Sequence, residues 1–297
     1  MVAGQEPAGK APPPAFRSGV DLVSLHVTVT DPEQHYVTGL RREDFAILED
    51  GKRQELTLFG VSEAPLALAV LLDSSASMLD NLAIMQDAAA GFVRELRPRD
   101  VATIIEFDTQ AQILSYFTSD RGALETAIRQ TWPDGATALY DALYIGLKEF
   151  DKLRAEDANG DTRRRAMVVL SDGDDTSSVV GLKDTLELAR RAGVVVYAIG
   201  IGVQPPGPGQ NVSRSADFAL RRIAQHTGGR AFFATEAQQL AGLYQEIARE
   251  LSSQYVLGYA STNTRRDGRW RRIAVTVRRE NVNVRTKPGY YAQKGPA

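Results

Sequence analysis

The sequence predicts an α/β protein whose main unit is a doubly wound, mostly parallel sheet with helices on both faces. A continuously apolar run at Leu66–Leu72 is typical of a central parallel strand that is covered on both sides. Similar runs at Ala166–Leu170 and Val194–Ile199 alternate with segments of helical spacing, which is the pattern of a doubly wound sheet. Before and after this unit, apolar and polar residues alternate with a period of two, which indicates half-exposed strands.

The N-terminal part of the chain is expected to contain a leader followed by a β segment. Residues 1–17 are rich in Ala, Pro and Gly, and we expect them to lie outside any fold. Residues 18–64 form the expected β segment. It opens with the alternating run Val23–Val29. Two apolar runs, Phe45–Leu48 and Leu56–Phe59, then flank an Asp-Gly dipeptide and predict a hairpin.

Residues 65–251 are expected to form the α/β domain. Apolar residues at intervals of three and four predict its helices, and short apolar runs predict its strands. The expected elements are, in order, strand 66–72, helix 79–96, strand 101–107, helices near 124–128 and 139–153, strand 166–170, helix 183–191, strand 194–199 and helix 237–251.

The period of two returns in residues 252–292, and residues 293–297 are expected to be a tail. Neither flanking β segment is long enough for a comfortable core of its own. We therefore expect 252–292 to pair with 18–64 in one small β-sandwich, with the α/β domain inserted between them. The expected C-terminal strands are 255–259, 273–277, 282–284 and 290–291.

Composition excludes several classes of function. The net charge is −2, so no overall charge selects for nucleic acid or an anionic membrane surface. The absence of cysteine excludes thiolate metal sites and a cysteine nucleophile, and His26, His35 and His226 never approach the spacing of a zinc protease. No apolar run reaches the ~18 residues needed to span a bilayer.

Five oxygen-bearing side chains are expected at one edge of the sheet. Asp73, Ser75 and Ser77 follow a buried strand, and Asp172 follows another. Thr137 stands in a Gly-Ala-Thr-Ala-Leu loop that opens a helix. Ligands of open α/β sheets bind outside the carboxyl ends of the strands. Carboxylates and hydroxyls suit Mg²⁺, Mn²⁺ or Ca²⁺, so the sequence predicts a divalent metal site.

Each of these residues also has an alternative reading. The run Asp73–Ser77 is compatible with a helix-capping loop, and Thr137 with an ordinary N-cap. Asp172 could belong to a polar turn. Asp174 and Asp175 are expected to be solvated rather than to bind the ion.

The motif Asp73-x-Ser75-x-Ser77, with Thr137 and Asp172, resembles the metal-ion-dependent adhesion site of von Willebrand factor type A domains. Three surrounding stretches are also similar, namely 135–142, 170–173 and 197–202. The resemblance as a whole covers residues 65–251. It implies a non-enzymatic protein-binding module of the adhesion type. Such a module binds Mg²⁺ (or Mn²⁺ or Ca²⁺) and a partner protein that presents Asp or Glu.

The strand Tyr255–Tyr259 and the terminal Gly289–Tyr291 resemble a bacterial group of such proteins. Its members are usually exported, so the resemblance implies an extracytoplasmic protein, although the chain as given carries no signal-peptide core. We expect no nucleic-acid partner, because the arginines of the C-terminal β region suit a solvated sheet face.

Two other functions remain open. One is a structural scaffold of an envelope assembly with a satisfied or empty metal site. The other is a metal-dependent hydrolase, which needs a general base beside the ion. Asp174 is the one residue that the sequence offers for that role.

Overall fold

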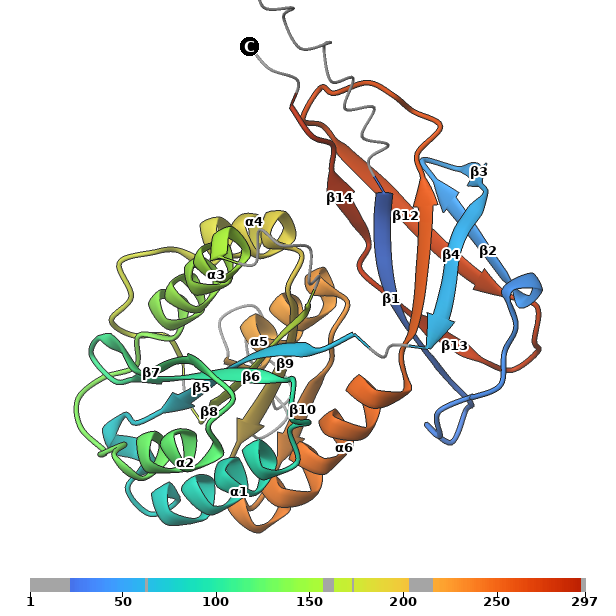
Figure 1. The fold of residues 1–297 in the computed structure, drawn as a ribbon. Helices are drawn as coiled ribbons and strands as arrows, with labels where there is room; N and C mark the ends of the chain where they lie inside the picture. Colours follow the sequence, from blue (N-terminus) through green and yellow to red (C-terminus); the bar gives the residue numbers. More distant parts are fainter. Residues whose placement is uncertain (1–21, 62–63, 157–162, 173, 203–215, 295–297) are drawn as a thin grey trace, which may run out of the picture.

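The structure is a computed structural model, and it describes residues 22–61, 64–156, 163–172, 174–202 and 216–294. The chain forms an α/β unit around one six-stranded sheet and a β unit of two four-stranded sheets (Figure 1). The leader predicted at residues 1–17 lies outside the described residues.

The six-stranded sheet has the order β10-β9-β8-β5-β6-β7, and all its neighbouring strands are parallel except β6 and β7. All eight residues of β5 are buried, which agrees with the central position predicted for this run. The doubly wound, mostly parallel sheet is therefore confirmed. Its strands are β5 (Leu66–Asp73), β6 (Val101–Phe107), β7 (Ala111–Thr118), β8 (Arg164–Ser171), β9 (Val195–Ile201) and β10 (Ala231–Ala234).

Within the described ranges, six helices cover the two faces of this sheet. Leu68 and Val70 of β5 pack with α1, α2 and α6 in one core, whereas Ala69 and Leu71 pack with α3, α4 and α5 in another. Alternate residues of the strand thus serve opposite cores, because successive side chains of a strand point to opposite faces. The helices are α1 (Leu82–Arg94), α2 (Arg121–Arg129), α3 (Leu139–Glu156), α4 (Leu182–Ala192), α5 (Ala216–Thr227) and α6 (Leu240–Ser253).

In the described residues, three short 3₁₀ turns complete the helical elements: η1 (Arg42–Asp44), η2 (Ala76–Met78) and η4 (Ala237–Gln239). The prediction omits β7, β10 and α5. β7 has no fully buried residue because it is an edge strand, and β10 has only four residues, so neither leaves a strong apolar pattern. Leu220 and Ile223 of α5 are buried at helical spacing, a signal that the prediction overlooks.

The β unit joins the two ends of the described chain. β1 pairs with β11, and β2 pairs with β12, both antiparallel. The sheet orders are β13-β1-β11-β4 and β14-β12-β2-β3. The expected flanking β structure is therefore present, while the domain boundaries remain a prediction. The strands are β1 (Leu22–Thr30), β2 (Phe45–Glu49), β3 (Lys52–Gln54), β4 (Leu56–Val61), β11 (Tyr255–Ala260), β12 (Trp270–Val277), β13 (Asn283–Arg285) and β14 (Gly289–Tyr291).

The hairpin predicted in the N-terminal segment needs a correction. β2 turns through Asp50 and Gly51, whose φ angles are 48° and 81°, and pairs with the short strand β3. The predicted return strand, β4, instead crosses to the other sheet and pairs with β11. Gln54 and Leu56 are both buried and Glu55 between them is exposed, so the chain changes sheets over a single residue.

Candidate metal centre

Asp73 and Asp172 lie at the same edge of the central sheet. β5 ends at Asp73, β8 ends at Ser171, and the two strands pair in parallel with Leu72 opposite Leu170. Their carboxyl ends therefore meet, as the sequence predicts for a site in an open α/β sheet. Asp73 is fully buried and Asp172 is half-buried.

Hydrogen bonds connect four of the five predicted ligands. The backbone N–H of Ser75 donates to Asp73 Oδ1 at 2.9 Å, and the hydroxyls of Ser75 and Ser77 lie 3.1 Å apart. Ser77 Oγ then donates to Asp172 Oδ1 at 2.8 Å. The turn η2 returns Ser77 toward Asp172, and for this reason α1 begins at Leu82, later than the predicted residue 79. Oxygen atoms at and just after the ends of β5 and β8 thus belong to one hydrogen-bonded series.

Thr137 is held beside these residues by its backbone. The N–H of Ala76 donates to the carbonyl of Gly135 at 3.2 Å, which joins the Thr137 loop to the Ser75 loop. The carbonyl of Thr137 accepts from the N–H groups of Thr176 and Ser177. Thr137 is buried, and within the described residues no hydrogen bond connects its hydroxyl to the other four side chains.

Gly135 has a conformation that this loop requires. Its φ is +65°, and a Cβ at this position would lie 2.2 Å from Thr109 Oγ1. The same hydroxyl accepts a hydrogen bond from the N–H of Ala136 at 3.1 Å. A side chain at position 135 would therefore push the Thr137 loop away from its anchor.

The structure adds Ser171 to the site, a residue that the sequence analysis missed. Its hydroxyl donates to Asp73 Oδ2 at 2.5 Å, and the residue is fully buried. Because Ser171 directly precedes Asp172 at a strand end, its place in the sequence could have identified it. It orients the Asp73 carboxylate from the side opposite to Ser75.

Asp175 differs from its predicted role. A solvated side chain is expected from the sequence, yet Asp175 Oδ1 accepts from the N–H of Tyr140 at 3.2 Å and from Ser178 Oγ at 2.5 Å. Asp175 therefore caps the start of α3 from a loop 35 residues away, and a contact of that range leaves no local signal. Asp174 is exposed, as expected.

Burial, with a smaller contribution from the nearby Asp172, raises the pKa of the Asp73 carboxyl to about 6, although hydrogen bonds from Ser171 and Ser75 oppose the shift. Burial also raises the pKa of Asp172. In the part of the chain that the structure describes, no Lys or Arg side chain forms an ion pair with either carboxylate. Two neighbouring carboxylates without a counter-charge favour the binding of a cation.

The donor set fits a hard divalent ion. It contains two carboxylates and three hydroxyls, all of them oxygen donors. The described residues contain no group of three or more carboxylate or imidazole side chains that could hold a metal without hydroxyls. A metal at this edge would therefore depend on Ser75, Ser77 and Thr137 as well as on the two aspartates.

Comparison with solved structures agrees with the architecture. A von Willebrand factor type A protein from Catenulispora acidiphila has a TM-score of 0.54 at 12% identity, covering 94% of this chain and 76% of that one. The proximal thread matrix protein 1 of the mussel byssus, with a zinc-occupied MIDAS motif, has a TM-score of 0.52 at 19% identity. That match covers 68% of this chain and 49% of the mussel protein. At these identities, the likeness shows the fold.

Comparison of sequences identifies the family. A protein of Mycobacterium sp. (strain KMS), named UPF0353 protein, is 28% identical over 206 residues, and one of Mycolicibacterium paratuberculosis is 26% identical over 208 residues. These matches span 66% and 67% of this chain and 60% of each relative's length. The family model of the von Willebrand factor type A domain matches residues 67–246. The chain therefore belongs to the von Willebrand factor type A family.

Proposed function

We propose that the chain is a non-enzymatic protein-binding module in which a divalent ion accepts a carboxylate from a partner protein. The ion is held by Asp73, Ser75, Ser77, Thr137 and Asp172. The observation that carries this proposal is the hydrogen-bonded series from Asp73 to Asp172, which places oxygen donors without a cationic partner at the binding edge of the sheet.

The charge of the site supports an open ion. Asp73 and Asp172 balance the charge of a divalent cation, and the hydroxyls of Ser75, Ser77 and Thr137 add none. A bound ion would supply a positive centre with coordination positions free for an Asp or Glu of the partner. Ser171 keeps the Asp73 carboxylate oriented while the partner binds.

Large exposed apolar side chains occur on the chain segments that carry the site residues. Leu79 is 66% exposed, Trp132 is 76% exposed and Val179 is 94% exposed. Leu79 follows the Ser77 turn, Trp132 precedes the Thr137 loop, and Val179 follows Asp172 in the same connection. Large exposed apolar side chains are typical of protein interfaces. They favour a protein partner over a small ligand.

The ion that we propose is Mg²⁺, with Mn²⁺ and Ca²⁺ as alternatives. Every donor is a carboxylate or hydroxyl oxygen, which suits hard cations, whereas most structural zinc sites include imidazole or thiolate ligands. The mussel protein carries zinc at its MIDAS motif, so zinc belongs in the test.

A hydrolase is less well supported than a binding module. Asp175 is committed to capping α3, and Asp174 is exposed, so neither is a buried general base beside the ion. An extracytoplasmic location remains a proposal that rests on the bacterial group which the flanking strands resemble. In the described chain, no helix is both long and apolar enough to cross a membrane.

The proposal is tested by calorimetric titration of the full chain with Mg²⁺, Mn²⁺, Ca²⁺ and Zn²⁺. Wild-type protein should bind at least one of the hard cations, and Asp73→Ala should lose this binding without a change in circular dichroism. Asp80→Ala is the matched control, because Asp80 is exposed and lies outside the ligand set. Equal affinity of wild type and Asp73→Ala for every ion would refute the site.

A further inference from the structure

A cavity of about 320 Å³ lies between the β unit and the α/β unit. Its walls include β1 on one side and the amino ends of β8 and β9 on the other, together with the ends of α4 and α5. The side chains that carry its chemistry are His26, Arg163, Arg165, Arg190, His226 and Lys287.

All the ionisable side chains that line this cavity are basic, and none of the described lining residues is an Asp or Glu. Burial, together with the positive charges of Arg164 and Lys287, lowers the pKa of His26 to about 4. Burial also lowers the pKa of Lys287 to about 8. Burial and nearby arginines, Arg190 first, lower the pKa of His226. Neighbouring positive charges thus add to the effect of burial at both histidines of the cavity.

Buried nitrogen atoms of the cavity wall lack a hydrogen-bond partner among the described residues. Nδ1 of His26 and Nε of Arg190 are both buried, and neither has a hydrogen-bond partner among the described residues. The Arg190 guanidinium lies 5.3 Å from the centre of the Trp270 ring, which fixes the side chain without using its N–H groups. Arg165 reaches the same wall and donates to the carbonyl of Ala192 at 3.4 Å. Buried donors without acceptors are costly, and a bound oxyanion would satisfy them.

We propose that this cavity binds a phosphate group, as inorganic phosphate or as a phosphate monoester, between the two units. A carboxylate carries one negative charge. A phosphate group carries close to two negative charges and has more acceptor oxygens. Arginine guanidinium groups match the oxygen geometry of phosphate, and Lys287 provides a point charge.

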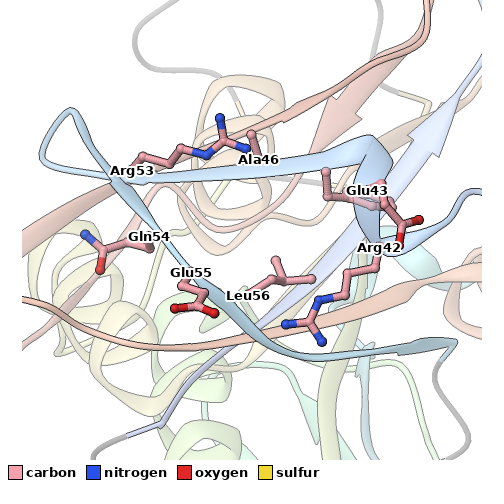
Figure 2. A pocket seen from close by; sticks show the side chains of 8 residues that line it. Arg42, Glu43, Ala46, Arg53, Gln54, Glu55 and Leu56 are labelled. Carbon is pink, nitrogen blue, oxygen red and sulfur yellow. The ribbon is translucent and has the colours of Figure 1, made fainter.

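A second hollow extends the site toward the surface. It measures about 520 Å³, shares Arg190 and Lys287 with the first cavity, and adds the rings of Tyr290 and Tyr291. This wall suits the organic part of a monoester. By contrast, the hollow of about 500 Å³ in Figure 2 lies in the β unit and carries two arginines and two glutamates, so its charges balance.

The phosphate site is independent of the metal site. Arg165 stands near the start of β8 and Ser171 at its end, six residues apart, or ~20 Å along a strand. The two sites thus lie at opposite edges of the central sheet. A phosphate would act on the junction of the two units, because His26 and Lys287 belong to the β unit and Arg190 to the α/β unit.

The experiment is calorimetric titration of the full chain with inorganic phosphate and with phenyl phosphate, at constant ionic strength maintained with chloride. The variants are Lys287→Gln and His26→Gln, and the control is Arg272→Gln, which removes an exposed positive charge outside the cavity. Wild type should bind, each cavity variant should lose about tenfold or more in affinity, and the control should not.

The two anions distinguish the sources of the phosphate. Tighter binding of phenyl phosphate assigns the site to a monoester, and equal affinities assign it to inorganic phosphate. Absence of binding to both, or equal affinity of wild type, Lys287→Gln and His26→Gln, would overturn the proposal. Asp73→Ala should retain phosphate binding, so a failure of the metal site is distinguishable from a failure of this one.

Discussion

Glu250 of α6 forms an ion pair with Arg285 of β13, with Oε2 2.6 Å from Nη2, and its side chain is completely buried. The other carboxylate oxygen accepts from the hydroxyl of Tyr197 at 2.7 Å and from Thr28 Oγ1 at 3.2 Å. One carboxylate therefore connects α6 and β9 of the α/β unit to β1 and β13 of the β unit. Only Gln254 separates α6 from β11, so this network fixes the last helix where it enters the second unit.

Removing one partner of this pair should destabilise the protein strongly. We expect Glu250→Gln to lower the free energy of unfolding by about 3 kcal/mol, because it leaves the Arg285 guanidinium without its buried counter-charge. Denaturant unfolding at neutral pH measures the effect. Glu187→Gln is the control, since its ion pair with Arg191 is about half exposed and should contribute ~0.5 kcal/mol or less. Similar losses in the two variants would contradict this account.

Bound metal should stabilise the folded chain. At a hundredfold excess of ion over Kd, the unfolding free energy should rise by about 2.7 kcal/mol, because the ion binds only the folded site. Thermal unfolding with Mg²⁺ and then with a chelator tests this. Ser77→Ala should reduce the gain, since Ser77 connects Ser75 to Asp172. If Mg²⁺ raises the unfolding free energy of Ser77→Ala as much as that of wild type, the Ser77 hydroxyl is not a metal ligand.

Gly135→Ala should distort the metal loop. The residue has a positive φ, and the new Cβ would clash with Thr109 Oγ1. We expect a loss of about 1–3 kcal/mol in unfolding free energy together with weaker metal binding. Gly91→Ala is the control, because Gly91 lies within α1 with open space around it and alanine favours helix. If Gly135→Ala binds metal as wild type does, the loop does not depend on this glycine.

His26 should make stability sensitive to acid. Its pKa in the folded protein is about 4, below the ordinary value of 6.5, because burial and the nearby Arg164 and Lys287 disfavour the charged ring. The unfolded chain therefore binds a proton first as the pH falls. The contribution of neutral His26 to the free energy of unfolding is complete above pH 6.5. It is lost progressively between pH 6.5 and 4, by up to about 3 kcal/mol.

Denaturant unfolding over this pH range measures the loss. His26→Gln should flatten the profile, because glutamine does not titrate. His35→Gln should retain the wild-type profile, since the His35 side chain is 79% exposed. A His26→Gln profile as steep as that of wild type would assign the acid sensitivity to other groups.

The sequence by itself determined the fold class and the position of the candidate ligands along the chain. A strand that is buried at every position, such as β5, must be covered on both faces, and this is visible as an unbroken apolar run. Asp73 and Asp172 follow such runs, so their place at strand ends required no knowledge of the tertiary structure. Periodicity is a local property, and it was sufficient for these elements.

The tertiary structure decided what depends on contacts between distant residues. The Asp175 cap on α3, the crossing of β4 to the second sheet and the basic cavity between the units have no local pattern. His26 and Lys287 are 261 positions apart in the sequence and meet only because β1 and the β13–β14 connection fold onto the α/β unit. Their charges become significant when packing removes them from water, which no single stretch of sequence records.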